Sequence, residues 1–321
     1  MQDFSSEFRS LHYVIRNAES VLLFAHTRPD PDAVGASIAL REYIRSLGKK
    51  ADIACFDRLP EFAAELFPGI VFRDPDALPV ETYDAVIASD SVDRGFQLLK
   101  ERFREEQVIV LVDHHPNIRM TGDIVIIDDT MSSSCEMLFH FFQTENITIT
   151  PKMATPLLMG ILGDTGNLQH SCTSLDTFAA VSTLIQKGAQ LQKITSDVFA
   201  NNKISTLQLW GKALSRARIN SGNGMIYSAI TERDIEELGN PSTEDLYIAS
   251  TLLNAVPDAK FSLLFYQLQP GIVRGSLRSE PHKNVDVSSI ARDLGGGGHA
   301  LAGGFEIPGT IVETPQGWEV R

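Results

Sequence analysis

The sequence VIVLVDHH, residues 108–115, joins a predicted buried strand to a chemically reactive end. Its first five residues are aliphatic, as in a parallel strand that is covered on both faces. The run stops at Asp113, His114 and His115, and ligands of open α/β sheets bind just beyond the carboxyl ends of strands. Adjacent histidines point in different directions, so one can bind a metal while the other faces a substrate. For an isolated Asp-His-His, the alternative is a polar transition from strand to loop.

A second polar group follows the short apolar run over residues 21–25. The loop HTRPDPD then brings His26, Asp30 and Asp32 close together in sequence. Its two prolines disfavour helix within the loop, and we expect Asp32 to cap a helix over residues 33–47. One imidazole and two carboxylates form a compact ligand set for a hard metal ion. A surface turn would also favour Pro and Asp, so the loop alone leaves both interpretations open.

Two further apolar segments end in a carboxylate. Residues 84–89 form a predicted strand that is followed by Asp90, and the apolar helix predicted over residues 156–162 leads to Asp164 between two glycines. A Gly-Asp-Thr-Gly sequence is a weak signal by itself. It becomes informative in combination with the three predicted strand ends, each of which also carries an acid or an imidazole.

Convergence of these residues would require cations. Four carboxylates in one place repel one another, and two divalent ions would cancel their formal charge. Oxygen-rich ligation with two imidazoles and no thiolate fits manganese or magnesium better than structural zinc. Two such ions about 3.5–4 Å apart suit in-line displacement at phosphorus. The sequence therefore predicts a two-metal centre that acts on phosphate esters, with Mn²⁺ as the expected metal and Mg²⁺ as the alternative.

The order of predicted elements indicates an α/β protein with two domains. Strands alternate with helices over residues 1–190, which predicts a doubly wound, mostly parallel sheet. A helical linker is expected over residues 191–220. Residues 221–321 contain predicted strands and helices of a smaller α+β domain.

Two motifs in the second domain are candidates for ligand contact. RGSLRS contains Ser276 and Arg278, and GGGGHALAGG begins at Gly295 and contains His299. Four consecutive glycines carry an entropic cost, and their amides can approach an anion closely. The alternative for the glycine run is a flexible turn.

Composition limits the partners. The chain has 321 residues, 43% of them hydrophobic, and a formal net charge of −13. Proteins that bind long nucleic acids usually carry an excess of Lys and Arg on one face, so an anionic substrate should be small here. Three widely spaced cysteines favour reduced thiols and a cytoplasmic location. We expect no signal peptide and no membrane span.

These motifs, in this order, resemble those of the DHH phosphoesterase family and its DHH-associated domain, over nearly the whole chain. The resemblance implies that His26, Asp30 and Asp90 hold one metal ion. It implies that Asp90 also bridges to a second ion, whose other ligands are Asp32, His114 and Asp164. His115 would then face the scissile phosphate, and Asp113 would orient it. The family often has Gly where this chain has Pro31, so we expect a stiffer loop that keeps both acids.

The resemblance also implies a substrate class. The associated domain of such proteins binds the nucleotide end of the substrate, and the matching residues here are Ser276, Arg278, Gly296, Gly297, Gly298 and His299. The match is closest to short oligoribonucleases (nano-RNases) that also remove the 3′-phosphate of adenosine 3′,5′-bisphosphate. Cleavage of linear or cyclic dinucleotides and a non-catalytic nucleotide-sensing module are the alternatives. The sequence leaves open the preferred substrate, the direction of attack and whether the chain forms a homodimer.

Overall fold

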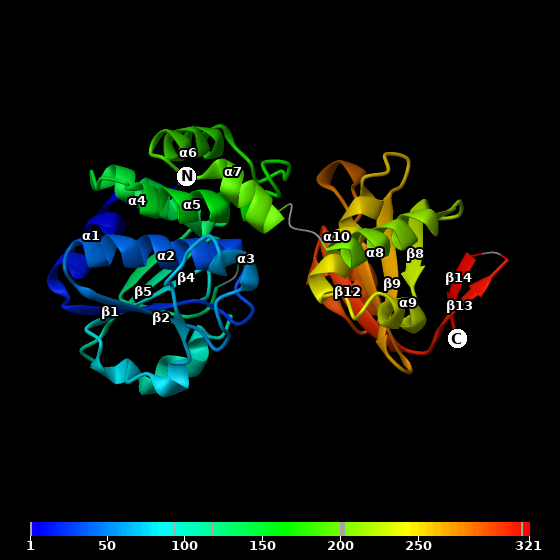
Figure 1. Cartoon of the computed structure of the whole chain (residues 1–321), viewed down its shortest axis with the longest axis horizontal. Coiled ribbons are helices and arrows are strands. Elements are labelled where there is room, and N and C mark those ends of the chain that lie inside the picture. The colour runs from blue at the N-terminus through cyan, green and yellow to red at the C-terminus, as the bar shows by residue number, and fades with distance from the viewer. Residues whose placement is uncertain (1, 93, 117, 200–202, 316) are drawn as a thin grey trace. The chain divides into compact units, whose positions relative to one another are not determined.

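A six-stranded parallel sheet forms the centre of the first part of the chain. In the computed structural model (Figure 1), which describes residues 2–92, 94–116, 118–199, 203–315 and 317–321, the strand order is β3-β2-β1-β4-β5-β6. The strands are β1 (Ser20–Phe24), β2 (Lys50–Ala54), β3 (Phe72–Arg73), β4 (Ala85–Ser89), β5 (Val108–Asp113) and β6 (Ile124–Ile127). This order, which reverses direction between β1 and β4, confirms the predicted doubly wound parallel sheet.

Helices cover one face of this sheet, and short 3₁₀ turns cover the other (Figure 1). The helices are α1 (Ser5–Asn17), α2 (Pro31–Ser46), α3 (Glu61–Ala64), α4 (Ser134–Thr144), α5 (Pro151–Asp164), α6 (Leu175–Gln186) and α7 (Leu191–Ile194). The 3₁₀ turns are Pro75–Ala77, Val80–Thr82 and Phe96–Arg102. Two hydrophobic clusters, one on each side of the sheet, bury its aliphatic side chains.

The chain divides into two units, Met1–Asn201 and Asn202–Arg321. The second unit contains a mixed sheet in the order β11-β12-β10-β9-β8-β7 and a separate hairpin, β13 with β14. Its strands are β7 (Arg218–Asn220), β8 (Met225–Ile230), β9 (Phe261–Gln269), β10 (Ile272–Arg278), β11 (Gly297–His299), β12 (Ala302–Pro308), β13 (Ile311–Thr314) and β14 (Gly317–Val320). Its helices are α8 (Ile204–Ser215), α9 (Glu232–Glu237), α10 (Thr243–Asn254) and α11 (Val287–Asp293).

The segment expected to be a helical linker is helical only in part. It contains α7, a π-helical turn over Thr195–Phe199, α8 and then strand β7. Helix α8 packs on α10 of the second unit: Thr206 Oγ1 donates to Asp245 Oδ1 at 2.9 Å, and Trp210 Nε1 donates to the Asp245 carbonyl at 3.0 Å. These contacts favour assigning α8 to the second unit, while the domain boundaries at residues 190 and 220 stay a prediction.

Among the described residues, the longest apolar helices are too short to cross a membrane.

Candidate metal centre

The point where the strand order reverses, between β1 and β4, carries the first two predicted ligands. His26 lies two residues after β1, and Asp90 directly follows β4. Both side chains are buried, with His26 0% and Asp90 1% exposed. Asp90 has a φ of 56°, in the left-handed region that non-glycine residues rarely adopt. Such backbone strain persists where the surroundings fix the residue, and here it accompanies a carboxylate aimed into the site.

The orientation of the His26 ring is fixed by its neighbour. Nδ1 lies 2.7 Å from the carbonyl oxygen of Thr27, so Nδ1 carries the proton and Nε2 presents a lone pair. Nε2 lies 3.3 Å from Asp30 Oδ2 and 3.5 Å from Asp90 Oδ2. A lone pair that faces two carboxylates is repulsive unless a proton or a cation lies between them. This is the arrangement that a metal-binding histidine shows when its second nitrogen is anchored by a carbonyl.

The two acids of the first loop have different supports. Asp30, rather than Asp32, caps α2: its Oδ1 accepts the amide of Ala33 at 3.0 Å. The expected capping role of Asp32 is therefore wrong. The helix begins at Pro31, two residues earlier than expected, because proline suits the first helical position, where its missing N–H is not needed.

Asp32 is instead held by the start of α4. Its Oδ2 accepts the amide of Ser134 at 2.7 Å, and its Oδ1 accepts the amide of Cys135 at 2.9 Å. Helix N-termini stabilise negative charge, so α4 favours an ionised carboxylate at this buried position. Ser133 caps the same helix through the amide of Glu136.

Two glycines allow α2, α4 and α5 to approach closely enough to bring Asp32 beside Asp164. A Cβ on Gly35 would lie 2.3 Å from the carbonyl oxygen of Pro156. A Cβ on Gly160 would lie 2.3 Å from Cys135 Sγ and 2.7 Å from Asp32 Oδ1. Neither position can hold a side chain without movement of the helices, so the spacing of the acids depends on these glycines.

The two histidines of the opening stretch point to different partners. His114 Nε2 lies 2.9 Å from Asp164 Oδ2 and 3.6 Å from Asp90 Oδ1. His115 Nδ1 lies 2.9 Å from Asp113 Oδ1 and 3.3 Å from Asp90 Oδ1. The second oxygen of Asp113 accepts the amide of Val92. Asp113 is thus buried and positioned to orient His115, whose side chain is 37% exposed.

Three overlapping groups of ligand atoms result, each within 4.8 Å. They are His26 with Asp30 and Asp90, Asp32 with His114 and Asp164, and Asp90 with His114 and His115. Within the described residues, His26 Nε2, Asp90 Oδ1 and His114 Nε2 are buried without a hydrogen bond. Buried polar atoms rarely lack a partner. Three such atoms in one place fit divalent metal ions held by imidazole nitrogens and carboxylate oxygens.

Because several carboxyl groups are buried close together, the pKa values of two of them are raised. Burial raises the pKa of the Asp164 carboxyl to about 6, aided by the charges of Asp30 and Asp90, although His114 opposes the shift. Burial together with the charge of Asp164 also raises the pKa of Asp32. These two carboxyl groups would bind protons more readily than usual when no cation is present.

The pKa values of the histidines are also raised, because the nearby carboxylates stabilise the protonated imidazoles. Burial alone would lower the pKa of His114, but Asp164 and Asp90 raise it to about 12. Asp30 and Asp90 likewise outweigh burial and raise the pKa of His26 to about 9. A hydrogen bond to Asp113 and the nearby carboxylate of Asp90 raise the pKa of His115 to about 9. Protons therefore occupy the sites that metal ions would take.

Arg94 is a residue of the site that the sequence interpretation missed. Its guanidinium lies 3.3 Å from Asp30 Oδ2 and 3.4 Å from Asp90 Oδ2, and its side chain is 40% exposed. The spacing of Arg94 four residues after Asp90 is visible in the sequence. Its contact with Asp30, 64 residues away, depends on the fold. A half-exposed arginine at this edge can bind a phosphate oxygen of a substrate.

The predicted ligand-contact residues of the second unit share one face of its sheet. Arg278 on β10 lies opposite Ala302 on β12, which in turn lies opposite His299 on β11. Directly opposed residues of antiparallel strands point to the same face, so Arg278 and His299 lie about 10 Å apart on it. Ser276 belongs to this face, but its buried hydroxyl donates to Ser250 Oγ on α10.

Arg278 is the most unusual side chain on that face. It is 8% exposed, its Nε has no hydrogen bond among the described residues, and its guanidinium lies 3.9 Å from the centre of the Tyr247 ring. Burial lowers the pKa of the guanidinium. A buried cation with an unused donor is suited to an anionic ligand.

The last two of the four glycines belong to an edge strand, and the first lies in the turn that precedes it. Gly297, Gly298 and His299 pair with β12 at the edge of the sheet. A Cβ on Gly296 would lie 2.1 Å from the carbonyl oxygen of Gly304, and one on Gly298 would lie 2.3 Å from that of Ala302. Close backbone packing therefore explains two of the glycines without a ligand.

Each of the two units matches the model of a known protein family. Residues 20–161 match the DHH family, N-terminal domain, and residues 225–314 match the DHHA1 domain. Among curated relatives, the bifunctional oligoribonuclease and PAP phosphatase NrnA of Bacillus subtilis (strain 168) is 26% identical over 295 residues, covering 90% of each chain. The protein of the same name from Thermus thermophilus is 26% identical over 309 residues, covering 96% of this chain and 90% of the relative.

Solved structures share the fold. An exopolyphosphatase-related protein from Bacteroides fragilis superposes with a TM-score of 0.85 at 19% identity, covering 95% of this chain and 92% of that one. The exonuclease RecJ bound to manganese superposes with a TM-score of 0.51 at 14% identity, covering 95% and 90%.

A parallel sheet that gathers imidazoles and carboxylates at its switch point, followed by a smaller glycine-rich domain, defines a hydrolase of phosphoester bonds. The chain contains a DHH domain followed by a DHHA1 domain, the two domains found in DHH-family phosphoesterases.

Proposed function

We propose that this protein hydrolyses short oligoribonucleotides and removes the 3′-phosphate of adenosine 3′,5′-bisphosphate, with manganese as its metal. The observation that carries the proposal is the meeting of His26 Nε2, Asp90 Oδ1 and His114 Nε2, all buried and without hydrogen bonds among the described residues. The names of the Bacillus and Thermus relatives, oligoribonuclease and PAP phosphatase, support the choice of substrates.

The residues would divide between two metal positions. His26, Asp30 and Asp90 would hold one ion, and Asp32, His114 and Asp164, again with Asp90, would hold the other. When bound, such ions lower the pKa of water and neutralise phosphate oxygens. His115, oriented by Asp113, would face the scissile phosphate and donate a hydrogen bond or a proton to it. Arg94 would neutralise a further phosphate oxygen from the exposed edge of the site.

Recognition of the substrate's other end would fall to the second unit. Arg278 has an unused Nε donor, and Tyr247 holds its guanidinium plane by a cation–π contact. His299 lies on the same face of the sheet, and the outer edge of β11 leaves glycine amides available to an anion. With a net charge of −13, the chain offers little attraction for a long polyanion beyond such local donors.

A second candidate is cleavage of linear or cyclic dinucleotides by the same centre. It needs no change in the metal ligands and differs only in how the second unit holds the substrate. A nucleotide-sensing module without turnover is less well supported, because every predicted metal ligand is present and directed into one cluster. Three cysteines that form no disulfide accord with the proposed cytoplasmic location.

The test is an assay of phosphate and nucleotide release with and without manganese. Purified full-length protein is incubated with adenosine 3′,5′-bisphosphate, with a linear diribonucleotide and with a cyclic dinucleotide. The proposal predicts manganese-dependent phosphate release from the bisphosphate and mononucleotides from the linear dimer. Turnover of the cyclic dinucleotide alone would favour the second candidate. Tight binding without turnover of any substrate would identify a sensing module.

A further inference from the structure

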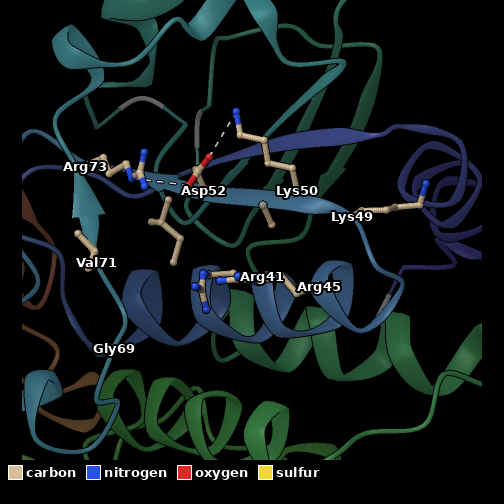
Figure 2. A pocket seen from close by; sticks show the side chains of 10 residues that line it. Arg41, Arg45, Lys49, Lys50, Asp52, Gly69, Val71 and Arg73 are labelled. Atoms are coloured by element: carbon tan, nitrogen blue, oxygen red, sulfur yellow. Dashed lines mark ion pairs between the residues drawn. The ribbon is translucent and has the colours of Figure 1, made fainter.

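A basic pocket lies on the first unit, away from the metal ligands. It has a volume of about 330 Å³ and is lined by Arg41, Arg45, Lys49, Lys50, Ala51, Asp52, Ile53, Gly69, Val71 and Arg73 (Figure 2). Its lining contains five of the chain's 28 Lys and Arg residues, although acids outnumber them with 41. On α2, Arg45 lies 13 positions after the predicted metal ligand Asp32. This spacing separates the two residues by about 20 Å along the helix axis.

The cations come from helix α2 and from the sheet edge formed by β2 and β3. Figure 2 shows Arg41 and Arg45 on α2, on one side of strand β2, and Lys50 turned toward Asp52 on the other side of that strand. The strand itself is open on one side at this level, since β3 pairs only with Ile53 and Ala54. The arginines of α2 therefore border the pocket on one face of the sheet edge, and Lys50 and Asp52 border it on the other.

The charges inside the pocket are only partly compensated. Asp52 lies 3.7 Å from Lys50 and 3.6 Å from Arg73, and it also accepts a hydrogen bond from Tyr83. Lys49 is directed away and donates to the Ala18 carbonyl. Asp52 thus pairs with Lys50 and Arg73, and Glu42 pairs with Arg41, so the charge of Arg45 is the one left without a carboxylate partner among the described lining residues.

Two arginines on the helix supply an independent sign of a missing anion. Arg41 and Arg45 stand one turn apart, where like charges destabilise a helix. Arg41 has a side chain that is only 14% exposed and is paired with Glu42. The side chain of Arg45 has no hydrogen bond or ion pair within the described part of the chain. Burial and the charge of Arg45 lower the pKa of Arg41, which shows that the pair is under electrostatic stress.

The pocket also has an apolar side. Val71 is 63% exposed beside it, whereas the lining residues Ala51 and Ile53 are buried, at 5% and 1% exposed. A volume of about 330 Å³ is near the lower end of small-molecule sites, which span about 300–1,000 Å³. These dimensions suit a small ligand that has both an anionic and a flat apolar part.

We propose that this pocket is a second binding site, distinct from the metal centre, for a mononucleotide or a similar phosphate monoester. Arg41 and Arg45 bind the phosphate from the helix, and Val71 contacts the base. Lys50 and Arg73, on the other face of the sheet edge, contribute charge only at longer range. A longer RNA that merely crosses this surface is the competing explanation, which the test below separates. The inference does not depend on the proposed function.

The experiment is calorimetric titration of the full-length protein, freed of metal by EDTA, with adenosine 5′-monophosphate and with inorganic phosphate. The titration uses an Arg278→Ala background, which removes the nucleotide contact proposed for the second unit, and in it the nucleotide should bind saturably at one site. Arg45→Ala should weaken binding about 10- to 100-fold, as expected for the loss of a charge-assisted hydrogen bond. Lys187→Ala, which removes an exposed cation elsewhere in the first unit, should leave the affinity unchanged.

Two further readouts keep the result unambiguous. Val71→Ser should weaken binding of the nucleotide but not of phosphate. Without ligand, Arg45→Ala should raise the melting temperature because it removes a like-charge neighbour of Arg41; a purely structural Arg45 would lower it. The inference is overturned if nucleotide and phosphate fail to bind at millimolar concentration. It is also overturned if Arg45→Ala and Lys187→Ala have the same effect on nucleotide affinity. It is also overturned if only 5′-phosphorylated RNA, and no mononucleotide, depends on Arg45.

Discussion

His114 Nε2 and Asp90 Oδ1 face each other at 3.6 Å, and both atoms are buried without a hydrogen bond among the described residues. Two donors that bind one ion at about 2.1 Å lie about 3 Å apart in an octahedral arrangement. The observed separation is therefore close to that of neighbouring ligands. The pair links the end of β4 to the end of β5, which makes the metal centre a product of the parallel sheet.

The first prediction separates the two adjacent histidines. His114→Ala should reduce manganese binding, because it removes a nitrogen directed at Asp90 and Asp164. His115→Ala should leave metal content near normal and lower kcat by about 10²- to 10⁴-fold, the range for loss of general acid–base or electrostatic assistance. Metal analysis after gel filtration and steady-state rates measure the two effects. Loss of manganese from the His115 variant would make His115 a ligand and reverse the assigned roles.

Much of this centre could be predicted from the sequence because its ligands follow local rules. Apolar runs that end in His26, Asp90 and Asp113 place polar groups at strand ends, and parallel strands share one such edge. Strand β5, Val108–Asp113, covers the aliphatic run at 108–112 that was predicted to be a buried strand. These features depend on periodicity and on the position of a residue relative to its own element.

The features that were missed depend on contacts between distant segments. The amides of α4 that hold Asp32 come from more than 100 positions away in the chain. Arg94 meets Asp30 only because β1 and β4 are neighbours. One error had a local remedy: proline favours the first helical position, so Asp30-Pro31 indicates Asp30 as the cap.

A second prediction tests the close packing around Asp32. Gly160→Ala should place a methyl group against Cys135 Sγ and Asp32 Oδ1, destabilising the protein by about 1–3 kcal/mol. Because Asp32 would be displaced, the affinity for manganese should fall by about tenfold or more. Gly211→Ala on α8, where a Cβ meets nothing within 4 Å, is the matched control. It should be neutral or slightly stabilising, since Ala favours helix. Equal behaviour of the two variants would show that Gly160 is not needed for the site.

A third prediction concerns pH. The pKa of His114 is raised to about 12 and that of His26 to about 9, so both imidazoles are protonated in the metal-free protein at pH 7.5. A metal needs the neutral nitrogen, so binding should release about two protons per chain, and affinity should rise with pH. Calorimetry of manganese binding in buffers of different ionisation enthalpy measures the protons released. An apparent enthalpy that is independent of the buffer would contradict the assignment of these histidines as ligands.

A fourth prediction concerns Arg278. Arg278→Ala should raise KM for a dinucleotide by about tenfold or more while manganese stays bound, because a charge-assisted contact is lost. Part of the effect can appear in kcat if that contact aligns the substrate. Arg274→Ala is the control on the same strand; Arg274 is paired with Glu306 at 2.6 Å. The second unit would not recognise the substrate through Arg278 if both variants kept wild-type kinetics.

The central claim is tested most directly by the manganese content of the wild type and of Asp90→Asn, measured by mass spectrometry after removal of free metal. Asp129→Asn, an exposed carboxylate outside the cluster, is the control. The account predicts two manganese ions per chain in the wild type and in the control. It predicts loss of both, together with most phosphoesterase activity, in a folded Asp90→Asn protein. Two tightly bound ions and normal turnover in Asp90→Asn would contradict the account.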